Sequence, residues 1–414
     1  MSVSKVEPKH DFAAKLRQPS LLPDVLKYVE WQKAVRKARA EGVALSEVPD
    51  WLGPFSINLD LTTACNYRCD HCIDFDILNS PIRYAHEKLM SSLTNMIARG
   101  LRSVIFIGGG EPTLYPKFGE MISFLKERNI QVAIVSNGSR NNVIYDNAEF
   151  FTEKDWVRLS LDAGTTDTFV RMHKPVKAIT LEEICSWVPR IRDKNPRLQV
   201  GFSFIIVWES AEAAHKDGKV SIVPNIGEIV EATKLAREHR FNYISFKPFL
   251  TRYPSGAEVM DPSVISDFKQ TINRIRLALD EAKAYETNDF RIVESTNLRV
   301  LETNSWQELT RQPKTCHMQA FHQVLSPIGL YNCPAWRGVE KGRIYDKKAY
   351  SDLDETKETQ KQVADILTRF DSSQECAHIT CLYNSANWWL EKAVKGDLTP
   401  EELEVLEEKF DYYF

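Results

Sequence analysis

The most informative stretch of this chain reads Leu61-Thr-Thr-Ala-Cys65-Asn-Tyr-Arg-Cys69-Asp-His-Cys72 and follows a strand-like run, Phe55 to Leu61. Thiolates are the usual protein ligands of cubane iron–sulfur clusters, and three thiolates leave one iron open for a small molecule. A zinc site normally needs four ligands, with a second Cys or His pair nearby, whereas His71 lies inside the triplet. The spacing therefore favours a three-thiolate iron–sulfur cluster over zinc or purely structural cysteines.

A glycine motif lies further along the chain, where the strand-like run Ser103–Ile107 leads into Gly108-Gly-Gly-Glu111-Pro-Thr113. Taken alone, three glycines predict only a turn. Main chain without side chains also lets a ligand approach the backbone closely at the end of a strand. After the cysteine triplet, this motif indicates a ligand-binding turn.

Together the two motifs resemble those of the radical S-adenosylmethionine (SAM) superfamily. Its cluster loop reads Cys-x3-Cys-x2-Cys with a ring residue before the last cysteine, here His71. The resemblance implies a SAM-binding 4Fe-4S cluster on the triplet and a methionyl site at Gly108, Gly109, Gly110 and Glu111. It also implies cleavage of SAM to methionine and a 5′-deoxyadenosyl radical that abstracts a hydrogen from the substrate.

Composition limits the class of protein. The chain has 414 residues, 43% of them apolar, and a net charge of −4, so it can form two domains with a large core but carries no footprint for nucleic acid. Apolar stretches such as Phe204–Trp208 are shorter than a bilayer span, and Met1–Asp11 lacks a signal-peptide core. Eight cysteines are too few for a disulfide scaffold. We expect a cytoplasmic protein with reduced thiols and no membrane partner.

Short β-branched runs alternate with longer helical patterns through the middle of the chain, which is typical of parallel βα units. Six units are too few to close an eight-stranded barrel, so we expect an α/β fold with a partial (β/α)6 TIM-like barrel. Ligands then lie at the carboxyl ends of the strands. The expected strands are Phe55–Leu61, Ser103–Ile107, Gln131–Ser136, Trp156–Leu161, Gln199–Val207 and Tyr243–Phe246, and the expected helices are Glu87–Arg99, Phe118–Arg128, Leu181–Asp193 and Ile226–His239.

Two further strand ends fit a SAM pocket. Asn137 follows the third strand, and Ser160 and Asp162 close the fourth. The family resemblance implies contacts of such positions with the ribose hydroxyls and the methionyl group, although Ser, Asn and Asp are also ordinary turn formers. A cation is needed for the SAM carboxylate, and each candidate is alternatively a solvated surface charge. These candidates are Arg140, Arg171 and Lys247.

A second group of thiols lies near the C-terminus, at Cys316, Cys333, Cys376 and Cys381. Four thiols fill a cubane completely. The first two flank an expected hairpin that turns at Pro327–Gly329, with a cysteine at each outer end. The other two follow a polar stretch, 340–362, and precede an expected helix, Ser385–Ala393.

The order of these cysteines resembles the twitch domain, the shortened relative of the SPASM domain of many radical SAM enzymes. The resemblance implies a small α+β domain with one auxiliary 4Fe-4S cluster that transfers electrons. Alternatively the cysteines are buried small hydrophobes. Nearby histidines either replace a thiol, hydrogen-bond or pack, and we expect Cys185 to be a core residue. These histidines are His317, His322 and His378.

These inferences predict three parts: a helical extension over 1–50 with a basic amphipathic pattern from Tyr28 to Ala40, a radical SAM core over 51–300, and an auxiliary-cluster domain over 301–414.

The favoured function is oxidation or rearrangement of a small polar metabolite such as a sugar, aminocyclitol or nucleoside. Peptide or protein modification by a maturase is the alternative within enzymes, and a protein with purely structural clusters is the alternative outside them. A reducing partner such as flavodoxin or ferredoxin is implied. No side chain is assigned as a catalytic acid or base.

Overall fold

The computed structural model describes residues 11–43 and 48–414. Its contacts divide the chain into two compact units that do not follow chain order. The first unit contains Leu59–Arg83 and Val104–Trp306. The second contains the described part of 7–58 together with Tyr84–Ser103 and Gln307–Phe414. The N-terminal helical segment therefore folds with the C-terminal region, and the three-part division at 50 and 300 stays a prediction.

A sheet with the strand order β2-β3-β4-β5-β8-β11 forms the centre of the first unit. Adjacent strands from β3 to β11 pair in parallel. Parallel pairing needs a return connection after each strand, which helices supply here. The strands are β2 (Ser103–Phe106), β3 (Gln131–Ser136), β4 (Trp156–Ser160), β5 (Gln199–Ile206), β8 (Tyr243–Pro248) and β11 (Arg291–Glu294).

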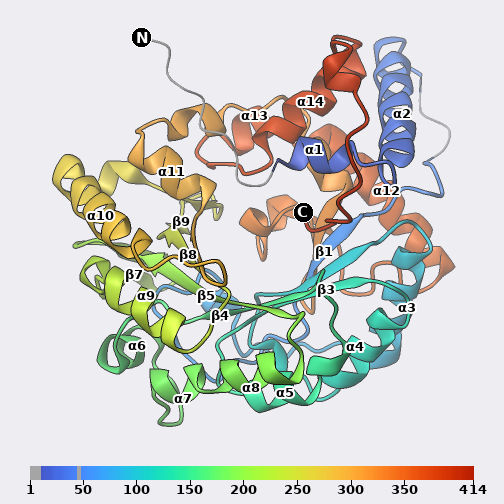
Figure 1. Ribbon diagram of the computed structural model, residues 1–414. Coiled ribbons are helices and arrows are strands. Elements are labelled where there is room, and N and C mark those ends of the chain that lie inside the picture. The colour runs from blue at the N-terminus through green and yellow to red at the C-terminus, as the bar shows by residue number, and fades with distance from the viewer. Residues whose placement is uncertain (1–10, 44–47) are drawn as a thin grey trace. The chain divides into compact units, whose positions relative to one another are not determined.

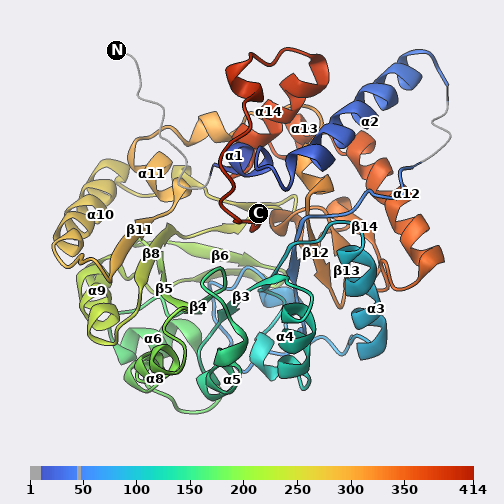
Figure 2. The same cartoon turned by 45° about the vertical axis from the view of Figure 1, so that its right-hand side comes forward.

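Helices cover the outer side of this sheet, as Figures 1 and 2 show for α4, α5, α8 and α9. Val157 and Leu159 of β4 are fully buried, and the residues that alternate with them are partly exposed. The apolar side of each strand thus contributes to the core with the helices. The helices of this unit are α4 (Phe118–Lys126), α5 (Asn141–Asp146), α6 (Thr166–His173), α7 (Leu181–Cys185), α8 (Trp187–Lys194), α9 (Ile229–Glu238), α10 (Phe268–Lys283) and α11 (Thr296–Glu302).

The predicted partial barrel is confirmed, and two of its elements differ from expectation. β11 was not predicted, because Arg291-Ile-Val-Glu294 is short and charged at both ends. The single helix expected over Leu181–Asp193 is divided into α7 and α8. Pro189 lies in the first turn of α8 and has no N–H to donate to the carbonyl of Cys185, so the helical ladder is interrupted. Two short hairpins, β6 (Glu212–His215) with β7 (Gly218–Ser221) and β9 (Thr251–Arg252) with β10 (Glu258–Val259), were also not predicted.

The second unit combines helices with strands in the order β1-β12-β13-β14. The predicted hairpin is present, because β12 and β13 pair antiparallel with Ser326 opposite Gly329. Cys316 does not end its first strand, because a 3-10 turn, His317–Ala320, lies before β12. The polar stretch at 340–362 contains β14 and most of α12, which lie side by side in Figure 2. The strands are β1 (Ser56–Leu59), β12 (His322–Ser326), β13 (Gly329–Tyr331) and β14 (Arg343–Tyr345).

The helices of the second unit are α1 (Phe12–Leu16), α2 (Leu22–Ala40), α3 (His86–Ile97), α12 (Leu353–Arg369), α13 (Ser372–Glu375) and α14 (Asn384–Lys395). The helix predicted from the basic pattern is the part of α2 from Tyr28 to its C-terminal end, and its residues Tyr28, Val29 and Val35 are buried. α14 includes the predicted helix Ser385–Ala393. Over the described part of the chain, no helix combines the length and the apolar character that crossing a membrane requires.

Candidate functional site

The loop after β1 brings Cys65, Cys69 and Cys72 close to one another. Burial raises the pKa of the Cys69 thiol well above its usual value, and the neighbouring charges of Cys72 and Cys65 raise it further. The loop is held by hydrogen bonds from the Cys65 amide to Asn79 Oδ1 (3.0 Å) and from the Cys72 amide to the Cys69 carbonyl (3.1 Å). Crowded, partly buried thiols become thiolates readily only beside a positive charge, which a metal cluster supplies. The three thiols therefore fit a cluster site.

Asp162 lies at the centre of a buried group next to this loop. Its Oδ2 is 3.2 Å from His71 Nε2 and 3.4 Å from His173 Nε2, and its Oδ1 accepts a hydrogen bond from the Ile205 amide (2.7 Å). Burial alone would raise the pKa of Asp162, but the hydrogen bonds from His173 and His71 outweigh it and hold the pKa below its usual range. Two predicted site residues, His71 and Asp162, are thus in contact.

His173 belongs to the same group and was not predicted. Its Nδ1 is 3.2 Å from Cys69 Sγ, and its Nε2 is 3.0 Å from the carbonyl oxygen of Leu161. Cys69, His71 and His173 offer ligand atoms that all lie within 4.8 Å of one another. Because Cys69 and His173 are 104 residues apart, no local spacing in the sequence marks this histidine.

The glycine motif packs against the backbone that leads into the cluster loop. A Cβ atom on Gly110 would lie 2.3 Å from the carbonyl oxygen of Ala64, and the Glu111 amide donates to that same oxygen (2.8 Å). Gly108 and Gly109 have positive φ, at 83° and 65°, where glycine is favoured. The bare main chain of Gly110 therefore serves close packing with the loop that carries Cys65.

The Glu111 carboxylate connects the ends of two strands. It accepts hydrogen bonds from Thr113 Oγ1 (2.6 Å), Ser136 Oγ (2.8 Å) and the Asn137 amide (2.8 Å). Burial nevertheless raises its pKa. The Asn137 side chain donates to Asn66 Oδ1 (3.0 Å) and also hydrogen-bonds Cys65. The predicted residues Glu111 and Asn137 thus lie at the cluster loop.

The remaining candidates in this unit lie in three different settings. Arg140 donates to the carbonyl oxygen of Thr113 (2.9 Å), which lies in the turn after the glycine motif. Arg171 is exposed and pairs with Asp167 (3.4 Å), so it has the surface character of the alternative interpretation. Ser160 and Lys247 are partly exposed residues of β4 and β8.

The second unit gathers the other four predicted thiols. Burial raises the pKa of Cys381 well above its usual value, and the nearby charges of Cys316, Cys333 and Cys376 raise it further. Asn387 Nδ2 lies 3.6 Å from Cys316 Sγ. These four side chains from separate parts of the second unit are therefore neighbours, as a shared metal group requires.

The three histidines near these thiols differ in their surroundings. His317 is hydrogen-bonded to Tyr28 Oη (2.8 Å) and Glu391 Oε2 (3.0 Å). His378 is exposed. His322 is buried, burial lowers its pKa to about 3, and within residues 11–43 and 48–414 neither ring nitrogen has a hydrogen-bond partner. Cys185 is fully buried in α7, which confirms its prediction as a core residue.

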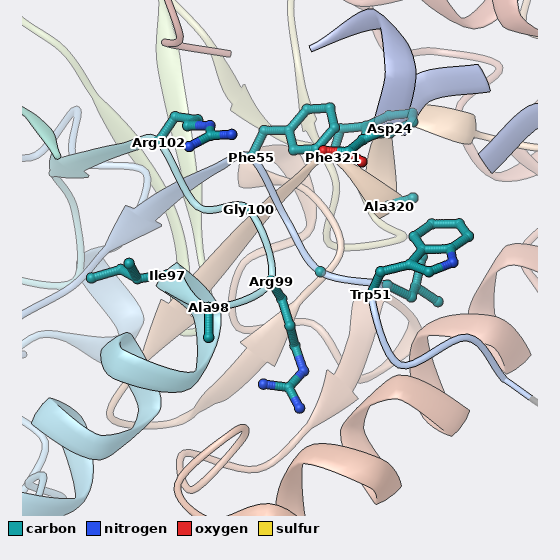
Figure 3. Close-up of a pocket in the computed structure, with 12 residues that line it drawn as sticks. Asp24, Trp51, Phe55, Ile97, Ala98, Arg99, Gly100, Arg102, Ala320 and Phe321 are labelled. Atoms are coloured by element: carbon teal, nitrogen blue, oxygen red, sulfur yellow. The ribbon is translucent and has the colours of Figure 1, made fainter. Parts of the chain in front are cut away.

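A pocket of about 300 Å³ lies elsewhere in the second unit. Figure 3 shows Trp51, Phe55, Arg99 and Phe321 among the side chains that line it. None of the residues predicted for SAM or metal binding is among the lining residues. The pocket is therefore not part of the candidate site.

The comparisons with known proteins agree with this geometry. Residues 59–209 match the Radical SAM superfamily. A S-adenosylmethionine-dependent nucleotide dehydratase from a Thermoplasmatales archaeon is 34% identical over 110 residues, a match covering 26% of this chain and 38% of that protein. The mycofactocin maturase MftC of Mycobacterium tuberculosis is 27% identical over 114 residues, covering 28% of this chain and 29% of that protein. The chain thus matches well under half the length of either relative.

Among solved structures, native anSMEcpe with bound AdoMet has a similar fold, with a TM-score of 0.53 and 15% identity. The superposition covers 84% of this chain and 98% of that one. Residues 59–209 thus match a radical SAM domain. The likeness to the solved structure shows that the fold is shared.

Proposed function

We propose that Cys65, Cys69 and Cys72 hold the SAM-binding 4Fe-4S cluster of this enzyme. The observation that carries the proposal is the convergence of this triplet with Glu111 and Asp162, from separate strand ends, on one loop within the radical SAM domain. SAM is then bound at this edge of the sheet by the backbone of Gly108–Gly110 and by neighbouring side chains. Those side chains are His71, Glu111, Asn137, Ser160 and Asp162.

Cys65, Cys69 and Cys72 would hold the cluster, which together with bound SAM would supply the radical chemistry of the reaction. The residues of the chain position and enclose these groups. The Glu111 carboxylate, through Ser136 and the Asn137 amide, keeps the ends of β2 and β3 in register beside the loop. Asp162 fixes the rings of His71 and His173 against the thiols. Fixed hydrogen-bonding groups of this kind orient a reactant and limit the access of water.

We further propose that Cys316, Cys333, Cys376 and Cys381 hold one auxiliary 4Fe-4S cluster in a twitch-like domain over 301–414. The mutual influence of the four thiols on their pKa values supports this ligand set. A cluster with four protein ligands has no iron open to substrate, so its role is to transfer electrons. The extension over 1–50 and the core over 51–300 complete the proposed organisation.

The proposed substrate is a small polar metabolite, and the proposed reaction is an oxidation or rearrangement. The inner side of the barrel strands supports this choice, because it carries serines and cations rather than a continuous apolar surface. The similarity to a nucleotide dehydratase points the same way. The similarity to the maturase MftC supports peptide modification as the second candidate. We propose a cytoplasmic enzyme reduced by flavodoxin or ferredoxin, without a nucleic-acid or membrane partner.

Replacing Cys65, Cys69 and Cys72 together with alanine tests the assignment of the SAM-binding cluster. The anaerobically reconstituted protein should hold about eight irons, and the variant about four, because one of two cubanes loses its ligands. Reductive cleavage of SAM to 5′-deoxyadenosine should disappear. Cys185→Ala is the matched control, since Cys185 is a buried core residue of α7 that is not assigned to either cluster. Surviving cleavage, or iron falling to zero, contradicts the assignment.

A further inference from the structure

The inward side of β4, β5 and β8 carries a set of polar residues in register. The pairing of these parallel strands places Arg158 beside Gly201 and Gly201 beside Tyr243. Two residues further along, three serines form the next row across the same strands, and Lys247 then lies beside Ile205. The serines are Ser160, Ser203 and Ser245.

Alternation along the strands shows which side these residues occupy. The residues between them are fully buried apolar side chains that pack towards the covering helices, among them Leu159, Phe204 and Phe246. Successive side chains of a strand point to opposite sides of the sheet. Arg158, the serines and Lys247 therefore share the inner side of the partial barrel.

Two cations on this side form no ion pair among the described residues. Throughout the described residues, the structure gives neither Arg158 nor Lys247 an ion pair, and Arg158 Nε is buried without a hydrogen-bond partner. The guanidinium carbon of Arg158 lies 5.3 Å from the centroid of the Trp156 ring. The charges of Asp162 and Glu258 act on Lys247 without forming an ion pair with it. Asp162 already accepts from the Ile205 amide and contacts two histidines.

Electrostatics adds to the cost of this arrangement. Burial lowers the pKa of Arg158, and it lowers the pKa of Lys247 well below its usual value. The charge of Arg158 lowers the pKa of Lys247 further, so the two cations repel each other. Charges that are largely withdrawn from water are normally paired, because an unpaired one loses hydration without compensation. An anion between the two cations would offset their repulsion and would pair with both of them.

Local packing places the Tyr243 hydroxyl group near Arg158: burial raises the pKa of that tyrosine, and the charge of Arg158 lowers it in part. A Cβ atom on Gly201 would lie 2.1 Å from Tyr243 Cζ and 2.5 Å from its hydroxyl oxygen. The Tyr243 ring therefore occupies the space above Gly201, which pairs with Arg158 on the adjoining strand. Any larger residue at position 201 would displace the ring. A hydroxyl donor, three serines and two cations then line the same part of the barrel.

We propose that Arg158 and Lys247 bind an anionic group of the substrate, a phosphate or a carboxylate, with the hydroxyl groups of Ser203 and Ser245 as additional donors. This inference rests on the proposed function in calling the ligand a substrate. Arg158 lies four positions before Asp162 in the chain, deeper along β4 than the residues assigned to SAM. A substrate held there by its anionic end extends its remaining atoms towards the cluster loop.

The test uses the reconstituted full-length protein and inorganic phosphate and malonate as probes, with chloride at matched ionic strength as the reference. Thermal unfolding is followed as each probe is titrated, with and without saturating SAM. At least one probe should raise the unfolding temperature saturably in both series, since a ligand that binds the folded state stabilises it. Lys247→Gln and Arg158→Gln should each weaken that binding about tenfold or more. Lys219→Gln, which alters an exposed lysine of β7, should not.

Stability of the ligand-free protein separates a binding role from a structural one. Lys247→Met keeps the length of the side chain but removes a desolvated, repelled charge, so its unfolding temperature without anion should rise. A fall, or probe binding equal to that of the unaltered protein, overturns the proposal. If SAM abolishes probe binding, and if Lys247→Gln weakens SAM binding to the same extent, the two cations bind the SAM carboxylate. That result also overturns the proposal. If phosphate or malonate binds as expected but SAM is not cleaved, the proposed function fails while the anion site stands.

Discussion

Replacing Asp162 with asparagine should destabilise the first unit while leaving its backbone unchanged. Asparagine matches aspartate in size and tolerates the positive φ of 53° at this position. Its Oδ1 can still accept from the Ile205 amide, but its NH2 group meets the Nε2 atoms of His71 and His173 at the present 3.2 and 3.4 Å. A hydrogen bond to a charged group contributes about 1.5–3 kcal/mol. Because both histidine contacts are longer than ideal, we expect a total loss of about 3 kcal/mol.

Urea unfolding of the anaerobically reconstituted protein measures this loss, and Asp167→Asn is the control. Asp167 is 80% exposed and pairs only loosely with Arg171, at 3.4 Å, so its replacement should cost less than about 0.5 kcal/mol. The sign of the pH dependence follows from the depressed pKa of Asp162. Its stabilisation is complete above the pKa of an unfolded aspartate, about 3.9, and is lost as the pH falls from there through the folded pKa.

The difference in unfolding free energy between the native protein and Asp162→Asn should therefore be constant near neutral pH and shrink below about pH 4. Equal urea midpoints for the variants at positions 162 and 167 would refute the account. So would a difference that stays unchanged in acid, because the contribution would then not come from the charge of Asp162.

Two further predictions concern the clusters. Replacing Cys316, Cys333, Cys376 and Cys381 with alanine should lower the iron content from about eight to about four and stop product formation, while reductive SAM cleavage continues; full turnover would exclude an obligatory electron relay. Gly110→Ala should displace the loop before Cys65, because the new Cβ lies 2.3 Å from Ala64 O. Iron content and SAM affinity by equilibrium dialysis should both fall, whereas Gly227→Ala, with no atom within 4 Å of the added Cβ, should change neither; unchanged iron content for Gly110→Ala would argue against the packing role.

The strands were predictable because each has a local pattern. β3, for example, spans Gln131–Ser136 as expected, since a run of apolar and β-branched residues bounded by turn formers is sufficient to indicate it. β11 lacks such a pattern and exists because it pairs in parallel with β8. The division between α7 and α8 follows from Pro189, a signal present in the sequence but outweighed by the helical periodicity around it.

In the candidate site, too, features encoded locally were predictable and contacts between distant residues were not. The cysteine triplet was visible because its spacing is local, and the strand-end residues Asn137 and Asp162 were visible because parallel strands end at one edge. His173 was not visible, because its relation to Cys69 depends on the end of α6 returning to the cluster loop. Glu111 was expected at the SAM site from its motif, but the sequence did not show that its carboxylate also connects the ends of β2 and β3.

The sequence by itself determined the class of chemistry, because three thiols at this spacing, followed by the glycine motif, carry their meaning within a few residues of one another. Only the tertiary structure decided which distant groups surround that chemistry. It placed Asp162 between His71 and His173, and it put Arg158 and Lys247 on the same inner side of the barrel without an ion pair among the described residues. The physical reason is that strand register and helix return paths, which depend on the packing of the whole unit, set these distances, whereas the spacing of ligands on one loop depends on the local chain alone.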